Sequence, residues 1–289
     1  MFVSGLELWQ WVNQAKIDAI ASEIPQVELD WLLQELAGLD KLALRLESFK
    51  DLPKIQLKLS VSELDRLWQR RLQERVPVQY LTGVAHWRDF SLKVTPAVLI
   101  PRPETELLID LAVDAMKSRH SVNPTSDWVD LGTGSGAIAI GLACALKNTT
   151  IHAVDCSSEA LAVARLNAEN LGFGSRINFY QGLFKGKVSG MVSNPPYIPS
   201  STVLTLQPEV LKHEPHLALD GGLDGLDCIR HLVETAPDYL ESGGVWLVEM
   251  MAGQETAVAD MLQSHGSYCD VQIFADLAGI DRFALAYRL

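Results

Sequence analysis

The sequence lacks several features that would assign it to a broad protein class at once. Its four cysteines are scattered and form no Cys-x-x-Cys pair, so neither a disulfide framework nor a zinc site is expected. The first residues contain no basic segment followed by an apolar core, and we expect no signal peptide. The longest strongly apolar stretch, Gly136 to Leu146, is too short to span a bilayer. These absences favour a cytoplasmic protein with reduced thiols and no membrane partner.

Positive charge is also scarce. The 289 residues include 24 Lys and Arg against 36 Asp and Glu, which gives a formal net charge of −12. Tight binding to a nucleic-acid backbone needs clustered basic side chains, so we expect no direct nucleic-acid binding, although a local basic patch is compatible with this balance. Hydrophobic residues make up 48% of the chain, enough for the core of one large domain or two ordinary domains.

The first quarter of the chain contains mainly helical signals. Residues 1–76 predict three main helices, one starting after Ser4, one over residues 25–36 and one over residues 63–75. The last of these carries a basic face opposite its leucines, formed by Arg66, Arg70, Arg71 and Arg75. We interpret this face either as simply solvated or as a surface for a partner.

Residues 77–100 predict a different kind of structure. Two runs, over residues 80–83 and 86–94, favour two short strands, and we interpret them as a β-hairpin that links two domains. The segment Ile100–Glu106 follows, in which two prolines forbid a helix. Thr105 can then start the next helix.

From about residue 127 onward, short apolar runs typical of strands alternate with helical segments. Such alternation favours an α/β fold with an open, mainly parallel sheet and helices on both faces. The last two strands, near residues 271–274 and 283–288, are joined by a short link, which favours an antiparallel pair at one edge. We therefore expect a Rossmann-like domain over residues 101–289.

A glycine-rich loop follows the first strand of this predicted sheet, with the sequence Asp130-Leu131-Gly132-Thr133-Gly134-Ser135-Gly136. Alternate glycines let the backbone turn sharply and approach a ligand in front of a helix. Asp155 closes the second strand, where an acid can hydrogen-bond the hydroxyls of a ribose. The pattern fits S-adenosylmethionine (AdoMet), whose amino group Asp130 would face, and also fits a nicotinamide or flavin dinucleotide.

The tetrapeptide Asn194-Pro195-Pro196-Tyr197 follows a later strand. An amide nitrogen is a poor nucleophile because its lone pair is delocalised, so a site that uses one must grip its NH2 hydrogens. The side chain of Asn194 offers one acceptor, and the carbonyl of Pro195 offers a second on a backbone that prolines fix. Tyr197 adds a flat face for a planar group. Alone, the tetrapeptide is an ordinary proline turn; beside an AdoMet loop, it predicts methyl transfer to an NH2 on a planar carbon.

With these motifs in place, the sequence resembles the HemK/PrmC family, AdoMet-dependent protein-(glutamine-N5) methyltransferases that act on peptide chain release factors. Apart from the glycine loop, the resemblance rests on Tyr80–Gly83, Ile100–Glu106, Ser193–Ile198 and Glu214-Pro215 before Ala218-Leu219, in the family's order. Asn-Pro-Pro-Tyr alone is shared with DNA adenine methyltransferases, but its combination with the proline-rich segment is far more specific. The resemblance covers nearly the whole chain and implies a class I AdoMet-dependent methyltransferase domain with an antiparallel last strand. It also implies that the helical domain, residues 1–76, helps to recognise the release factor.

The resemblance also implies roles for individual residues. AdoMet would be held by Asp130, Gly132, Thr133, Gly134, Ser135, Gly136, Asp155, Leu183 and Asn194. Asn194 and Pro195 would accept hydrogen bonds from the glutamine NH2, with Tyr197 on the amide plane and Pro196 completing the substrate site. The target would be the glutamine of the Gly-Gly-Gln tripeptide in release factors 1 and 2, whose methylation supports translation termination. We expect a monomer without a metal, and we propose no general base.

One segment departs from the family, and two others allow more than one interpretation. The loop Gln181–Gly190 is short where the adenine should lie, so Leu183 is our candidate for an apolar wall and Phe184 its rival. The two histidines of His213–His216 make a poor metal site because a proline separates them, and we favour a loop near the substrate entrance. Glu104 and Glu106 could act as an acid/base pair, but complementing the charge of a helix N-terminus accounts for them better.

The residues alone are also compatible with two other functions. One is an N6-adenine or other exocyclic-amine methyltransferase acting on nucleic acid, against which the acidic balance weighs. The other is a non-catalytic dinucleotide-binding module, which the glycine loop alone would also allow.

Overall fold

The computed structural model describes residues 1–118, 127–182 and 184–289. They form two units, which we call the helical unit (Met1–Val84 with Pro208–His213) and the sheet unit (Ala85–Gln207 with Glu214–Leu289). No helix within these described ranges is long and apolar enough to cross a membrane.

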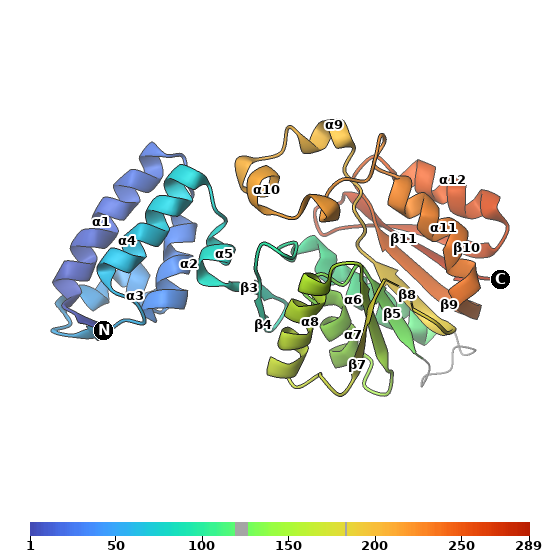
Figure 1. Ribbon diagram of the computed structural model, residues 1–289, viewed down its shortest axis with the longest axis horizontal. Coiled ribbons are helices and arrows are strands. Elements are labelled where there is room, and N and C mark those ends of the chain that lie inside the picture. The colour runs from blue at the N-terminus through green and yellow to red at the C-terminus, as the bar shows by residue number, and fades with distance from the viewer. Residues whose placement is uncertain (119–126, 183) are drawn as a thin grey trace. The chain divides into compact units, whose positions relative to one another are not determined.

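The helical unit contains six helices, and all but α10 contribute side chains to one apolar core (Figure 1). They are α1 (Gly5–Ala21), α2 (Gln26–Ala37), α3 (Lys41–Leu46), α4 (Val61–Gln69), α5 (Val78–Thr82) and α10 (Pro208–His213), with 3-10 turn η1 (Ser48–Asp51), π-helical turn η2 (Arg70–Glu74) and the strand pair β1 (Phe2–Val3) and β2 (Ile55–Gln56). The indole of Trp68 is fully buried at the centre, among leucines of α1, α2 and α4.

Side chains at the helix starts of this unit follow the sequence signals. Ser4 caps α1 by accepting a hydrogen bond from Glu7 N, and Gly38, at φ 67°, ends α2. Ser60 caps α4, in a capping box with Glu63. The predicted starts of these helices are confirmed.

The segment between the two units differs from the expected hairpin. Residues 80–82 lie in helix α5 and not in a strand, because Pro77 presets the helical entry and Gly83, at φ 70°, ends the helix in the left-handed conformation. The hairpin is confined to β3 (Val84–Trp87) and β4 (Phe90–Lys93), which pair only with each other.

The sheet unit is built on a seven-stranded sheet in the order β10-β11-β9-β8-β5-β6-β7. The strands are β5 (Trp128–Leu131), β6 (Ile151–Asp155), β7 (Ile177–Gln181), β8 (Val188–Ser193), β9 (Leu240–Glu249), β10 (Tyr268–Ala275) and β11 (Asp281–Arg288). Strands β7, β6, β5, β8 and β9 are parallel neighbours, and β11 runs antiparallel to both β9 and β10. The predicted antiparallel edge pair and the class I methyltransferase fold are confirmed.

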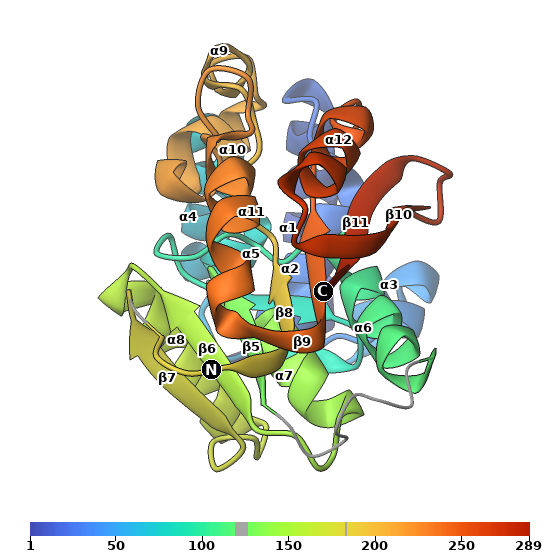
Figure 2. The same ribbon diagram turned by 90° about the vertical axis from the view of Figure 1, so that its right-hand side faces the viewer.

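Helices cover both faces of this sheet (Figures 1 and 2). They are α6 (Leu107–Ser118), α7 (Ala137–Ala145), α8 (Ser158–Asn170), α11 (Asp227–Tyr239) and α12 (Glu255–His265); shorter turns are η3 (Glu104–Glu106), α9 (Ser200–Val203) and η4 (His216–Ala218). Alternate residues of β9 enter two separate cores, Val245 and Leu247 with α6 and α7, Trp246 and Val248 with α11 and α12. This alternation is that of a strand buried on both faces.

The register of the parallel strands aligns their carboxyl ends. Leu131 lies opposite both Val154 and Ser193, and Ser193 lies opposite Val248. The glycine loop after β5 and Glu249 at the end of β9 therefore lie at the same edge of the sheet. Folds of this type bind ligands at that edge.

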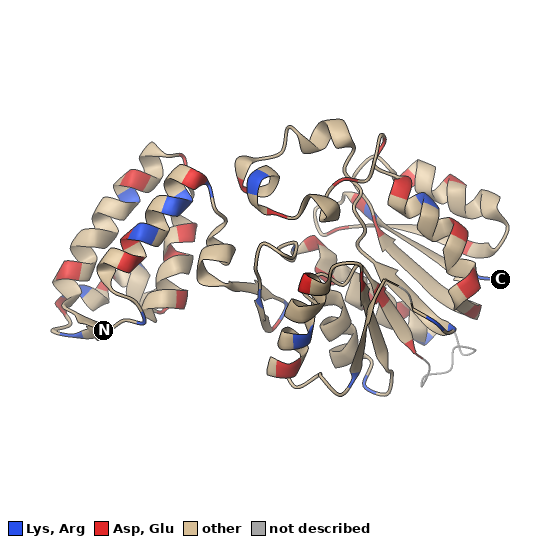
Figure 3. Ribbon diagram, viewed as in Figure 1, with Lys and Arg blue, Asp and Glu red and all other residues tan. Residues whose placement is uncertain are grey.

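The basic face of residues 63–75 takes a form that neither interpretation anticipated. Arg71 is only 3% exposed, and its guanidinium donates hydrogen bonds to Glu28 of α2 and to Glu209 of α10, at 2.8 Å each. Arg75 pairs with Glu209 as well, and Arg70 makes an exposed pair with Glu74. Figure 3 shows acidic positions interspersed with the basic ones over these helices. Arg71 therefore stabilises the helical unit from inside.

We expect Arg71→Ala to lower the free energy of unfolding by about 3 kcal/mol, because it leaves two largely buried carboxylates without their cation. Arg70→Ala is the matched control and should cost less than about 1 kcal/mol, since its ion pair is exposed. Urea unfolding of both variants measures the difference. Equal losses would mean that Arg71 contributes no more than a surface arginine.

Candidate active site

The glycine loop connects β5 to α7 through three left-handed residues. Gly132, Gly134 and Gly136 have φ values of 74°, 53° and 83°, which other residues rarely adopt. A Cβ on Gly136 would lie 3.1 Å from the Cβ of Ala164, so this glycine also permits close packing on α8. Nothing lies within 4 Å of the corresponding position on Gly132, which leaves space above the loop.

Asp130 lies beneath this loop and is fully buried. One carboxylate oxygen, Oδ2, accepts hydrogen bonds from Thr133 Oγ1 at 2.6 Å and from Ala139 N at 3.0 Å. The other oxygen, Oδ1, is buried without a partner among the described residues. Burial raises the pKa of this carboxyl to about 7, against the lowering effect of its two hydrogen bonds. An unpaired buried acceptor of this kind requires a donor.

Asp155 closes β6 beside the same loop. Its Oδ2 accepts a hydrogen bond from Gly134 N and its Oδ1 one from Ser157 N, both at 2.9 Å. The carboxylate thus fixes the glycine loop, and each oxygen retains a lone pair for a further donor. Ser135 is buried, and its carbonyl accepts from Asn167 of α8 at 2.8 Å.

These residues fit AdoMet. Asp130 Oδ1 offers a buried acceptor for an ammonium group, Asp155 offers acceptors for hydroxyls, and Gly132 leaves room for a ligand against the backbone. The predicted cofactor residues from Asp130 to Gly136 and Asp155 are therefore together at the carboxyl edge of the sheet.

The tetrapeptide leaves β8 at the same edge. Ser193, the last strand residue, donates to Leu131 O at 2.8 Å and ties the start of the tetrapeptide to the strand before the glycine loop. Asn194 is half-buried and Pro195 buried. The Asn194 amide donates through Nδ2 to Thr105 Oγ1 at 3.1 Å. Its Oδ1 atom and the Pro195 carbonyl make no hydrogen bond within the described residues.

Tyr197 is held at both its backbone and its side chain. Its hydroxyl donates to Glu249 Oε1 at 3.0 Å, and its carbonyl accepts from Gln254 Nε2 at 3.0 Å. Burial and the neighbouring Glu249 raise the pKa of the phenol, so it remains a neutral donor. A Cβ on Gly225 would lie 2.3 Å from the Tyr197 carbonyl, so only glycine allows this loop to pack against the tetrapeptide.

The chain matches two family models, the PrmC N-terminal domain over residues 7–83 and the Methyltransferase small domain over residues 107–223. It is 52% identical to the release factor glutamine methyltransferase of Synechocystis sp., over 100% of this chain and 98% of that protein. The relative of the same name from Thermosynechococcus vestitus is 50% identical, over 96% of each chain. The chain belongs to the release factor glutamine methyltransferase family.

A solved structure outside this family shares the fold. The catalytic domain of hMettl16, solved in complex with MAT2A 3'UTR hairpin 6, superposes with a TM-score of 0.54 at 15% identity, over 81% of this chain and 84% of that one. At this identity the likeness shows the fold alone.

Two segments that carry the resemblance to the release factor glutamine methyltransferases meet in the structure. Arg102, in the proline-rich segment, donates to Glu214 Oε1 at 2.8 Å, and Ile100 N approaches Glu214 Oε2 at 3.4 Å. Burial raises the pKa of Glu214, although Arg102 opposes this. Glu106 accepts from Arg88 N, so it anchors the hairpin next to the start of α6.

The structure describes only one of the two residues expected to form the apolar wall of the adenine site. Leu183 lies outside the described residues. Its rival Phe184 is buried, with its ring centroid 4.7 Å from that of His152 and 5.6 Å from that of Tyr180. Phe184 thus belongs to the core on one face of the sheet, which leaves little of its surface for a cofactor.

The two histidines near the proposed entrance have separate partners. The His213 Nε2 atom lies 2.8 Å from Glu74 O in the helical unit, whereas His216 lies 3.9 Å from Asp220 in the sheet unit. The described ranges contain no group of three acidic, histidine or cysteine residues suited to a metal ion.

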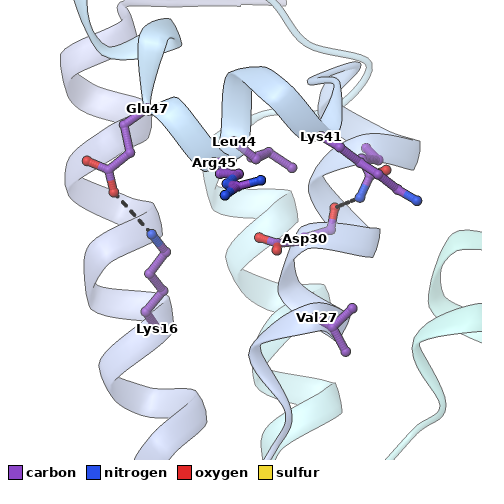
Figure 4. A pocket seen from close by; sticks show the side chains of 8 residues that line it. Lys16, Val27, Asp30, Lys41, Leu44, Arg45 and Glu47 are labelled. Carbon is purple, nitrogen blue, oxygen red and sulfur yellow. Dashed lines mark hydrogen bonds and ion pairs between the residues drawn. The ribbon is translucent and has the colours of Figure 1, made fainter.

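A surface depression of about 490 Å³ belongs to the helical unit (Figure 4). Lys16 pairs with Glu47 at its rim at 3.2 Å, and burial raises the pKa of Asp30, against an opposing effect of Lys16. None of its lining residues belongs to the glycine loop or the tetrapeptide. This depression therefore contains none of the groups that the methyltransferase chemistry needs.

Sequence reasoning missed three residues whose side chains hydrogen-bond the tetrapeptide, Thr105, Glu249 and Gln254. Thr105 was expected only to start a helix. Glu249 had a signal that was overlooked, because an acid at the end of the apolar run 245–248 repeats the pattern of Asp130 and Asp155.

We expect AdoMet to bind this family member more weakly as the pH falls below about 7, because protonation of Asp130 removes the negative charge that attracts the ammonium group. Asp130→Asn should weaken binding about 10- to 100-fold at pH 8 and flatten its pH dependence. Titration calorimetry between pH 6 and pH 8 measures both effects, with the exposed Asp238→Asn as control. An unchanged pH profile in Asp130→Asn would argue against this contact.

Proposed function

We propose that this protein transfers a methyl group from AdoMet to the side-chain amide nitrogen (N5) of the glutamine in the Gly-Gly-Gln motif of peptide chain release factors 1 and 2, and so supports translation termination. The family membership and the names of its relatives support the substrate class. The observation that carries the chemistry is the orientation of Asn194, whose NH2 is engaged by Thr105 while its carbonyl is left to accept.

In this proposal, bound AdoMet supplies an electrophilic methyl group on a sulfonium. Asn194 Oδ1 and the Pro195 carbonyl accept the two hydrogens of the glutamine NH2 and hold its nitrogen in line with that methyl. Both acceptors also stabilise the positive charge that develops on the nitrogen during transfer. The side chains described at this edge offer acceptors rather than a dedicated base, so the proton released after transfer passes to water.

The remaining tetrapeptide residues shape the substrate site. Pro196 and the buried Pro195 fix the backbone that presents the carbonyl. The ring of Tyr197, held by Glu249, packs on the plane of the glutamine amide. Asp130, the glycine loop and Asp155 hold AdoMet, and Leu183 remains our proposal for the adenine wall.

The family membership does not favour the rival readings. An exocyclic-amine methyltransferase would share the fold and the tetrapeptide, but the curated relatives that match nearly the whole chain carry the name of a protein-glutamine enzyme. We further propose that the protein acts as a monomer in the cytoplasm, without direct nucleic-acid binding. Its net charge of −12 and its four scattered cysteines, with no Cys-x-x-Cys pair, support this proposal.

We expect a release factor incubated with this protein and AdoMet to gain about 14 Da on the Gly-Gly-Gln peptide, one methyl replacing one hydrogen. Asn194→Ala should lower the rate about 100-fold or more, as expected when a preorganised hydrogen-bond group is lost from an active site. Mass spectrometry of the digested release factor measures both.

The matched control is Asn170→Ala, an exposed asparagine at the end of α8, which should retain the wild-type rate. DNA and ribosomal RNA serve as competing acceptors in the same assay. Label transferred only to nucleic acid would contradict the proposed substrate, and undiminished transfer by Asn194→Ala would contradict the role of the tetrapeptide.

A further inference from the structure

Glu249 is a buried carboxylate that has no direct role in the proposed methyl transfer. It is 1% exposed at the end of β9. Its Oε2 atom accepts a hydrogen bond from Thr105 Oγ1 at 2.7 Å, and its Oε1 atom accepts one from Tyr197 OH at 3.0 Å. Within the described ranges no lysine or arginine forms an ion pair with it. Two hydroxyl groups therefore satisfy the carboxylate.

The hydrogen bonds of Thr105 form a chain with a fixed direction. Burial raises the pKa of the Glu249 carboxyl to about 7, so above that pH it is ionised and can only accept. A hydroxyl has one hydrogen, and Thr105 then gives that hydrogen to Glu249. The Thr105 oxygen is then available only as an acceptor for Asn194. The Asn194 side chain must turn its NH2 toward Thr105, at 3.1 Å, and its Oδ1 atom away from it.

This direction matters for the reaction because the two ends of an asparagine amide have similar shapes and opposite hydrogen-bonding roles. With Oδ1 toward the substrate, Asn194 accepts from the glutamine NH2. With the amide reversed, two NH2 groups would face each other and neither could accept. The same carboxylate also holds the hydroxyl of Tyr197, so one buried group orients both polar side chains of the tetrapeptide.

We propose that Thr105 and Glu249 are positioning residues that fix the Asn194 amide with its carbonyl toward the substrate nitrogen. This inference rests on the proposed function for its catalytic consequence, but the orientation of the amide is a property of the protein alone. Neither residue need touch AdoMet or the glutamine.

The first test compares two substitutions of Thr105 that differ in the hydroxyl. Thr105→Val keeps the branched shape but leaves the Asn194 NH2 against a methyl group, and an unpaired donor of this kind should lower kcat/KM about 10- to 100-fold. Thr105→Ser keeps the hydroxyl and should recover most of that loss. The AdoMet Kd should remain within about twofold of wild type in both.

Thr149→Val is the matched control. Thr149 is also a buried threonine, at 1% exposure, but its hydroxyl has no partner in the described residues, and it lies just before β6, at the end of the strand away from the site. This variant should methylate at the wild-type rate. The positioning role is wrong if Thr105→Val methylates at the rate of an active wild type. It is also wrong if the kcat/KM of Thr105→Ser is as low as that of Thr105→Val.

The second test observes the amide directly and needs no substrate. In protein labelled with 15N at asparagine, the Asn194 NH2 signal is assigned by its loss in Asn194→Asp. We expect nuclear Overhauser contacts from these protons to the Thr105 methyl in wild type, and faster exchange with water in Thr105→Val. The absence of those contacts would overturn the proposal. A wild-type protein that shows them yet methylates no release factor would refute the proposed function and leave the orientation established.

Discussion

The register of the parallel strands is the constraint on which the rest of the site depends. Because β5, β6, β8 and β9 end level with one another, four chain segments far apart in sequence present Asp130, Asp155, Asn194 and Glu249 at one edge. A shift of one strand by a single residue would turn its side chains to the other face. Burial of the strands on both faces by two separate cores makes such a shift costly.

At the carboxyl edge of the sheet, each buried acceptor either has a donor within the protein or is available to a donor of a ligand. Asp155 accepts from the backbone of the glycine loop and Glu249 from two hydroxyls, whereas Asp130 retains one buried oxygen without a partner among the described residues. We propose that this oxygen binds the cofactor, because a ligand that supplies its donor gains affinity from a group that folding left unsatisfied. Asp155 also fixes the glycine loop, and Glu249 fixes the side chains of Thr105 and Tyr197.

Local signals predicted most of the fold. The cap at Ser4, the apolar spacing of the helices and the alternation of strands and helices were sufficient because each acts within a few residues. The sequence predictions were wrong where tertiary contacts, or residues flanking the segment, override the local pattern. Residues 80–82 looked like a strand but are held as a helix by Pro77 and Gly83, and Arg71 looked like a surface charge but is buried between two glutamates.

The sequence by itself determined the family, and it predicted the methyl donor and the role of the tetrapeptide. These depend on contiguous motifs whose backbone requirements are local. Only the tertiary structure decided which way the Asn194 amide points and what holds Tyr197. Those answers depend on Thr105 and Glu249, which lie 89 and 55 residues away from Asn194 along the chain. Hydrogen bonds between such distant residues form only when the strands are in register. No short stretch of sequence can therefore predict them.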